Sequence, residues 1–142
     1  ASLQVVGSLA PPGDVNDLAF SPDSARLATG ETMNGLRVWA VASRRQLRAL
    51  SYDPTTAERV HAVAFSSDGT TVYAGGRFFG PRAWNVQSGR GRTLLANGLG
   101  VAELAVSPDG LRVACLRGRW TLSLLVLEAA TGRRLWSRPY PA

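Results

Sequence analysis

The sequence predicts an all-β fold made of three four-stranded antiparallel units. The first observation is a repeat, because similar ten-residue stretches begin at Val15, Val60 and Val101, which are 45 and then 41 residues apart. The second is that each repeat contains four short apolar segments separated by turn residues, which is typical of antiparallel strands. The third is that no segment has apolar residues at helical spacing.

The predicted strands occur in the same order in each copy. They are VNDLAFS, ARLATG, LRVWAV and RQLRAL in the first, VHAVAFS, TTVYAG, PRAWNV and RTLLA in the second, and VAELAVS, LRVACL, LSLLVLE and RRLWS in the third. The sequences SPDS, SSDG and SPDG separate the first two strands, since Pro, Asp and Gly favour turn dihedrals and Asp accepts hydrogen bonds from turn amides. We therefore interpret Asp23, Asp68 and Asp109 as turn residues rather than calcium ligands. Asn34 and Gly35 form a favoured hairpin pair.

Four antiparallel strands every 41 to 45 residues are the expected period of a β-propeller blade. The SPDG turn after an apolar strand, and the segments VWAVASR and AWNVQSG, resemble the corresponding parts of WD repeats. The resemblance extends from Val15 to about Trp136. It implies an all-β propeller of WD-repeat type with three degenerate blades.

The sequence departs from the family pattern at several positions. The repeated tryptophan is present as Trp39 and Trp84 but is replaced by Leu127 in the third copy, and the family's Gly-His pair is missing from all three. We therefore expect that the hydrogen-bonded tetrad of typical WD repeats does not form. We expect Trp39 and Trp84 to pack in the core between blades.

The repeat predicts three blades at residues 15–51, 52–98 and 99–142. Residues 1–14 are interpreted as the outermost strand of a preceding blade, LQVVGSLA at 3–10, followed by a linker. Propellers have about 4 to 8 blades, so three blades leave two apolar faces uncovered. We expect further blades from a longer chain, from identical copies or from a different chain to complete the ring.

Composition narrows the class of protein. The chain has 142 residues, 45% of them hydrophobic, and a net charge of +6. No apolar stretch is long enough to span a membrane and the first residues lack a signal-peptide pattern, so we expect a cytoplasmic protein. All 16 basic residues are arginine and isoleucine is absent, a bias that suggests a GC-rich genome.

The sequence contains few residues suited to catalysis. His61 is the only histidine and Cys115 the only cysteine, so no pair of these residues has the spacing of metal ligands. The sequence also contains no phosphate-binding glycine loop and no GxSxG motif. Cys115 is interpreted as a small core residue. We therefore expect a non-catalytic protein without cofactor or metal. The alternative is a hydrolase or oxidoreductase with its site in the axial funnel of the propeller.

Arginine recurs at the predicted turn into each outermost strand, and we refer to these residues as the basic arc. They could blunt an exposed sheet edge, or bind an acidic protein surface, a nucleic acid or phospholipid. Stacking of nucleic-acid bases is weakly supported, because Trp136 and Tyr140 are the only aromatic residues near the arc. The basic arc consists of Arg45, Arg90 and Arg133, with Arg44, Arg92 and Arg134 beside them.

The family resemblance also implies a partner-binding surface. In WD repeats, residues that flank the first apolar position of the innermost strand often contact protein partners. The first two copies have polar residues there, whereas the third does not, so we expect a protein-binding scaffold or sensor module of a larger bacterial protein. The flanking residues are Asp14 and Asn16, then Arg59 and His61, then Gly100 and Ala102.

Overall fold

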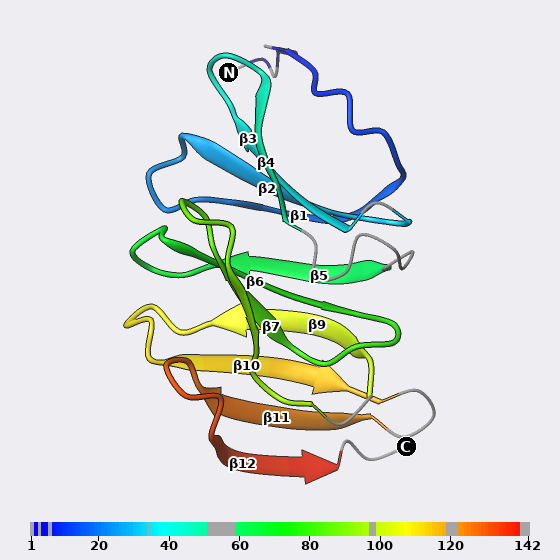
Figure 1. Ribbon diagram of the computed structural model, residues 1–142, viewed down its shortest axis with the longest axis vertical. Coiled ribbons are helices and arrows are strands. Elements are labelled where there is room, and N and C mark those ends of the chain that lie inside the picture. The colour runs from blue at the N-terminus through cyan, green and yellow to red at the C-terminus, as the bar shows by residue number, and fades with distance from the viewer. Residues whose placement is uncertain are drawn as a thin grey trace.

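The computed structural model describes residues 2, 4, 5, 7–33, 35–50, 59–96, 99–118 and 122–139. These residues form three four-stranded antiparallel sheets, stacked one upon another in Figure 1. We call the sheets blade 1, blade 2 and blade 3. Blade 1 contains β1 (Val15–Phe20), β2 (Arg26–Glu31), β3 (Gly35–Ala40) and β4 (Arg45–Leu50); blade 2 contains β5 (Val60–Phe65), β6 (Thr71–Gly76), β7 (Arg82–Asn85) and β8 (Gly91–Thr93); blade 3 contains β9 (Val101–Val106), β10 (Arg112–Arg117), β11 (Ser123–Glu128) and β12 (Arg134–Pro139).

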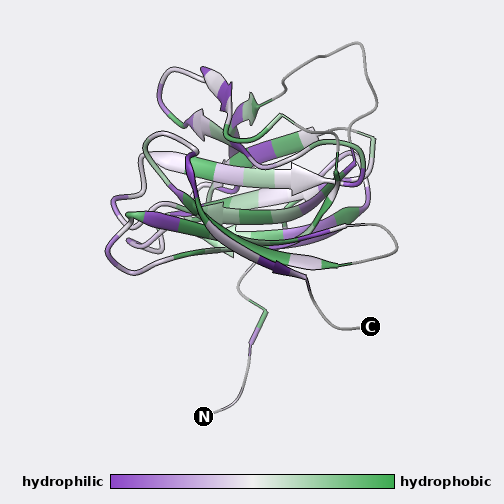
Figure 2. Ribbon diagram, turned by 90° about the horizontal axis from the view of Figure 1, so that it is seen from below, coloured by the Kyte–Doolittle hydropathy of each residue, from purple (hydrophilic) through white to green (hydrophobic). Residues whose placement is uncertain are grey.

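All twelve strands predicted within the three copies are confirmed, and they pair in sequence order within each blade. The described part of the chain includes no helix long and apolar enough to cross a membrane. Polar turns alternate with apolar strands, so that in Figure 2 the green segments lie mainly in the strands and purple segments lie at many of the turns.

The predicted turn between the first two strands of each blade is held by a serine and an aspartate. In blade 2, Ser66 Oγ donates to Asp68 Oδ1 at 2.6 Å and accepts from the Thr71 N–H at 3.0 Å. Asp68 also accepts from the Thr70 N–H at 2.9 Å. Ser21 with Asp23, and Ser107 with Asp109, make the same contacts, which confirms the prediction that these aspartates stabilise turns.

Two apolar clusters hold the blades together. The first joins blades 1 and 2 and includes Leu36, Val38, Val63 and Trp84. The second joins blades 2 and 3 and includes Tyr73, Leu104, Val113, Leu125 and Leu127. The prediction that Trp84 packs between blades is therefore confirmed, and Leu127 takes the same role in the third repeat.

Trp39 is buried, but not between two described blades. It pairs with Leu27, one residue from the Ala28 and Val38 pair, which packs against blade 2. Since successive side chains of a strand point to opposite faces, Trp39 lies on the other face of blade 1. The burial of Trp39 agrees with a core position, and its packing against a preceding blade stays a prediction.

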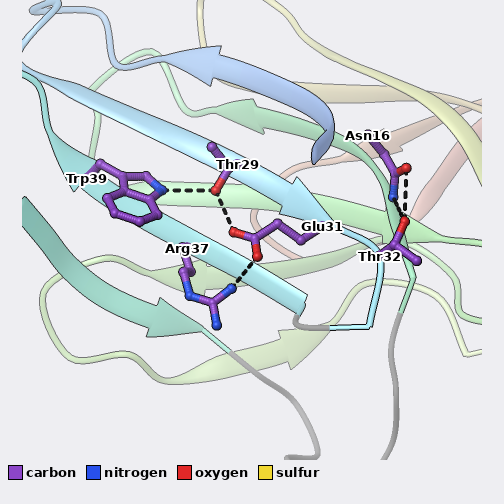
Figure 3. Close-up of polar contacts among 6 residues, drawn as sticks. All are labelled: Asn16, Thr29, Glu31, Thr32, Arg37 and Trp39. Atoms are coloured by element: carbon purple, nitrogen blue, oxygen red, sulfur yellow. Dashed lines mark hydrogen bonds and ion pairs between the residues drawn. The ribbon is translucent and has the colours of Figure 1, made fainter. Parts of the chain in front are cut away.

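A hydrogen-bonded network surrounds Trp39, although the histidine of typical WD repeats is absent. Trp39 Nε1 donates to Thr29 Oγ1 at 3.0 Å, and Thr29 Oγ1 donates to Glu31 Oε1 at 3.0 Å. Arg37 forms an ion pair with the other oxygen of Glu31 (Figure 3). The histidine-containing tetrad of typical WD repeats is replaced here by a network of different composition, which Glu31 and Arg37 complete and which was not predicted from the sequence. Glu31 is fully buried, and this pairing compensates its desolvation.

The outer faces of the stack are apolar and partly exposed. Leu18 and Phe20 on blade 1 are 55% and 58% exposed, and Leu124 on blade 3 is 36% exposed. Leu18 and Phe20 flank Ala19, which packs against blade 2, so their side chains point away from that blade. The expectation of two uncovered apolar faces is met for these residues.

The predicted strand at residues 3–10 is not formed by its described residues, Gln4, Val5 and 7–10. An outermost strand pairs with the third strand of its own blade, and no described segment provides such a partner. Residues 7–9 lie instead beside Phe20 and Leu27, on the open face of blade 1. The described residues form twelve strands, and the assignment of residues 3–10 to a preceding blade stays a prediction.

Candidate partner-binding surface

The innermost strand of every blade begins with a β-bulge at the position expected to contact partners. The strand register shifts between Val15 and Asp17 in blade 1 and between Val60 and Ala62 in blade 2. In blade 3, Arg117 pairs with Val101 while Leu116 pairs with Glu103. The extra residues are Asn16, His61 and Ala102, so the structure makes these three equivalent. Bulges re-aim side chains and are frequent beside functional sites.

A backbone hydrogen bond fastens each bulge to the turn after the second strand. The Thr32 N–H donates to the Asp14 carbonyl at 2.9 Å, and the Arg77 N–H donates to the Arg59 carbonyl at 3.2 Å. Blade 3 repeats the contact from Gly118 to Gly100 at 3.2 Å. The candidate residues of the first two blades therefore adjoin the β2–β3 and β6–β7 turns, which lie along one side of the stack in Figure 1.

Asn16 uses its side chain to join the first two blades. Its Nδ2 donates to the Val60 carbonyl at 2.9 Å and lies 3.0 Å from Thr32 Oγ1, as Figure 3 shows for the latter pair. The Thr32 hydroxyl is also 3.1 Å from Asn16 Oδ1. Asn16 is therefore a structural tie, whereas Asp14, Arg59 and His61 are exposed.

The adjoining turns contain three further exposed residues that were not predicted from the sequence, Met33, Arg77 and Phe78. Met33 and Phe78 are 64% and 63% exposed, which is unusual for large apolar side chains. The guanidinium carbon of Arg77 lies 5.4 Å from the centroid of the Phe78 ring, within cation–π range. The signal available in the sequence was the pair Phe78–Phe79 in a turn too short to bury both rings. We refer to Arg59, His61, Arg77, Phe78 and Met33 as the turn surface.

The basic arc is less uniform than the sequence suggests. Arg45, Arg90 and Arg134 are exposed, as expected. Arg133 lies 3.4 Å from Glu128 Oε1, in an exposed ion pair. Arg92 Nη2 instead donates to the Ala129 carbonyl of blade 3 at 2.5 Å, so this arginine joins two blades.

Arg44 differs from its counterparts in backbone conformation. Its φ is +57°, where the other two blades have Gly89 and Gly132 with φ of +73° and +76°. A left-handed conformation is natural for glycine and unfavourable for arginine. The turn geometry of the repeat therefore sets the position of Arg44, and its side chain lies against Gly7.

The reactive side chains do not converge among the described residues. No group of three or more His, Cys, Asp or Glu side chains that could hold a metal ion occurs in that part of the chain. Cys115 is 1% exposed within the second cluster, and burial raises the pKa of its thiol to about 11. The interpretation of Cys115 as a core residue is therefore confirmed, and its thiol stays protonated at neutral pH.

Comparison with known proteins agrees with this architecture. The profile of the family described as WD domain, G-beta repeat, matches residues 3–40. Apoptotic protease-activating factor 1 of Homo sapiens is 31% identical over 103 residues, which are 68% of this chain and 8% of that protein. Hydrazine synthase of Kuenenia stuttgartiensis superposes on 96% of this chain with a TM-score of 0.83 at 17% identity, and U3-55K superposes on 91% with a TM-score of 0.75 at 20% identity.

The three stacked sheets, the repeated serine–aspartate turns and the profile match define a propeller built of WD repeats. The chain belongs to the WD-repeat β-propeller family. WD repeats are generally protein-interaction scaffolds. One similar structure is named as an enzyme, so the fold by itself does not separate scaffolds from enzymes. The chain covers 40% of each of the two similar structures and 8% of the human relative.

Proposed function

We propose that this chain is a non-catalytic module that binds a protein partner through the turn surface. It acts as the scaffolding or sensing part of a larger cytoplasmic bacterial protein, whose other blades complete the ring. The observation that carries the proposal is the combination of a β-bulge at His61 with exposed Arg59, Arg77 and Phe78 beside it. Exposed arginine and aromatic side chains are enriched at protein interfaces.

The polar groups near the axis support binding better than catalysis. Asn16 and Asp17 are occupied by structural hydrogen bonds, since Asp17 Oδ2 accepts from the Val63 N–H at 2.8 Å and Oδ1 accepts from the Leu18 N–H. His61 is the single histidine of the chain. General acid–base chemistry needs groups placed within hydrogen-bond reach of a reacting atom, and Asn16 and Asp17 are engaged with backbone instead.

Site-specific photo-crosslinking tests the proposal. A crosslinker is attached to cysteine in His61→Cys, within a Cys115→Ser background, and the chain is exposed to lysate of the source cell. We expect defined protein adducts that excess unlabelled parent chain suppresses and that excess Arg59→Ser/His61→Ser does not. The matched control is Arg90→Cys, on an exposed turn of the same blade. Equal adduct patterns from positions 61 and 90 would contradict the assignment of the turn surface.

A further inference from the structure

We propose that the β6–β7 turn, with Arg59, forms an anchor for an acidic peptide segment of the partner that carries one large apolar side chain. The inference rests on the proposed function and specifies the chemistry of the partner. Its observation is that adjacent residues Phe78 and Phe79 have opposite environments, since Phe78 is 63% exposed and Phe79 is 8% exposed.

The turn that carries Phe78 is held on three sides. Phe79 is anchored in the first apolar cluster, and the guanidinium carbon of Arg82 lies 4.7 Å from the centroid of its ring. The Arg77 N–H is bonded to the Arg59 carbonyl. A Cβ at Gly100 would lie 2.3 Å from the Arg77 carbonyl oxygen, so the start of blade 3 is pressed against the turn. Phe78 is therefore displayed by a restrained backbone, which lowers the entropy cost of binding.

The side chains beside Phe78 favour an anionic ligand. The Arg77 guanidinium lies near the Phe78 ring, and the backbone of Arg59, whose side chain is exposed, is bonded to the backbone of Arg77. Neither arginine has an ion pair with another described residue. Of the acids in the neighbouring blade 1, Asp17 is bonded to two amides and Glu31 is paired with Arg37. Two guanidinium groups can thus donate hydrogen bonds to carboxylates while an apolar side chain packs on the exposed ring.

The arrangement favours a peptide over a nucleic acid. A strand of nucleic acid requires a row of cations along its phosphates together with aromatic stacking. The exposed arginines of the basic arc lie at the β3–β4, β7–β8 and β11–β12 turns, which are on the opposite side of the stack from the β6–β7 turn (Figure 1). Met33, exposed at the neighbouring β2–β3 turn, adds apolar surface rather than charge.

Peptide display tests the anchor. A random-peptide library is selected on the parent chain, and the affinity of the most enriched peptide is measured by isothermal titration. We expect enriched sequences to combine net negative charge with one aromatic or large aliphatic residue. Phe78→Ser and Arg77→Ser should each weaken binding by about tenfold or more, equivalent to about 1.4 kcal/mol, while Phe78→Leu retains most of it. Arg90→Ser, on the opposite side, is the matched control.

The outcomes separate the two proposals. If the enriched peptides bind the parent, Phe78→Ser and Arg77→Ser equally, the anchor is wrong while protein binding stands. If they lack acidic residues, the stated chemistry is wrong. If no peptide binds the parent chain, both proposals are overturned. Retention of single-stranded DNA that depends on Phe78 would replace the peptide by a nucleic acid. Arg77 and Phe78 are exposed, so replacing them should change the stability of the chain little. Equal melting temperatures of the parent and the variants verify that the variants fold.

Discussion

Arg92 of blade 2 donates a hydrogen bond from Nη2 to the carbonyl oxygen of Ala129 in blade 3, 2.5 Å away. Arg48 does the same one blade earlier, toward the Gln87 carbonyl at 2.6 Å. The two positions are equivalent, because Arg48 pairs with Val38, Arg92 pairs with Ala83, and these partners occupy the same place in β3 and β7. The equivalent position in β12 is Trp136, which pairs with Val126. The Trp136 side chain is 47% exposed.

This contact predicts that Arg92→Ala destabilises the chain by about 1 to 2 kcal/mol, since a hydrogen bond from a charged donor is lost. Urea unfolding followed by tryptophan fluorescence measures the change. Arg90→Ala is the matched control, because Arg90 is exposed at the start of the same outer strand and should change the unfolding free energy by less than about 0.5 kcal/mol. Equal effects of the two substitutions would show that the inter-blade contact contributes nothing.

The burial of Trp84 predicts that Trp84→Ala destabilises the protein by about 3 to 5 kcal/mol. Its side chain is 1% exposed within the first cluster, so truncation leaves a cavity between blades 1 and 2. Trp39→Ala should cost a similar amount, because it also removes the hydrogen bond to Thr29. Thermal melting within a degree or two of the parent would contradict the blade alignment at its best-defined position.

The serine–aspartate turns predict a loss of stability in acid. Hydrogen bonds from Ser66 and Thr70 lower the pKa of Asp68 to about 2, and equivalent bonds lower the pKa of Asp23 and Asp109. A pKa lowered in the folded state means that the stabilisation is complete above about pH 4 and is lost as pH falls toward 2.

The measurement is the urea midpoint as a function of pH for the parent and for Asp23→Asn/Asp68→Asn/Asp109→Asn. We expect the triple variant to lose less stability than the parent between pH 4 and 2. Asp14→Asn, an exposed carboxylate outside these turns, is the control and should follow the parent. Parallel curves for the triple variant and the parent would argue against the turns as the source.

The exposed basic arc predicts salt-sensitive binding to polyanions. Replacing Arg45, Arg90 and Arg133 together by serine should leave the melting temperature nearly unchanged and reduce the retention of the chain on heparin, because fewer counterions are released on binding. Arg92 is excluded from this set, since it has a structural role. If the triple variant is retained on heparin as strongly as the parent, the basic arc does not bind polyanions, and its role is to protect sheet edges.

The open faces predict that the isolated chain associates. Leu18 and Phe20 at one end, and Leu124 and Trp136 at the other, occupy positions whose counterparts in the stack contact the next blade. Several hundred Å² of such surface corresponds to on the order of 10 kcal/mol per face at about 25 cal/mol per Å².

Light scattering at micromolar concentration measures the association. We expect a ring-closing oligomer of identical copies unless the rest of a longer propeller is supplied, and we expect Phe20→Asp/Leu124→Asp to reduce the mass toward that of one chain. The control is Leu47→Asp, because Leu47 is exposed on the outermost strand β4. A monodisperse, cooperatively folding parent species of 15.1 kDa would contradict the prediction.

Local interactions account for what the sequence by itself determined. The strands and the turns at Asp23, Asp68 and Asp109 follow from apolar segments bounded by turn residues, whose dihedral preferences and hydrogen bonds act within a few positions. The repeat also located the equivalent positions Asn16 and His61, because a period in the sequence becomes a rotation of equivalent blades in space.

The tertiary structure decided the role of residues whose contacts lie in another blade or on one face of a strand. Arg90 and Arg92 look alike in sequence, but only Arg92 reaches a carbonyl of the next blade. Phe78 and Phe79 are adjacent, yet one ring fills the space between blades and the other remains exposed. Side chains alternate in direction along a strand and carbonyl groups are presented by distant segments, so these outcomes depend on how the sheets stack rather than on residue type.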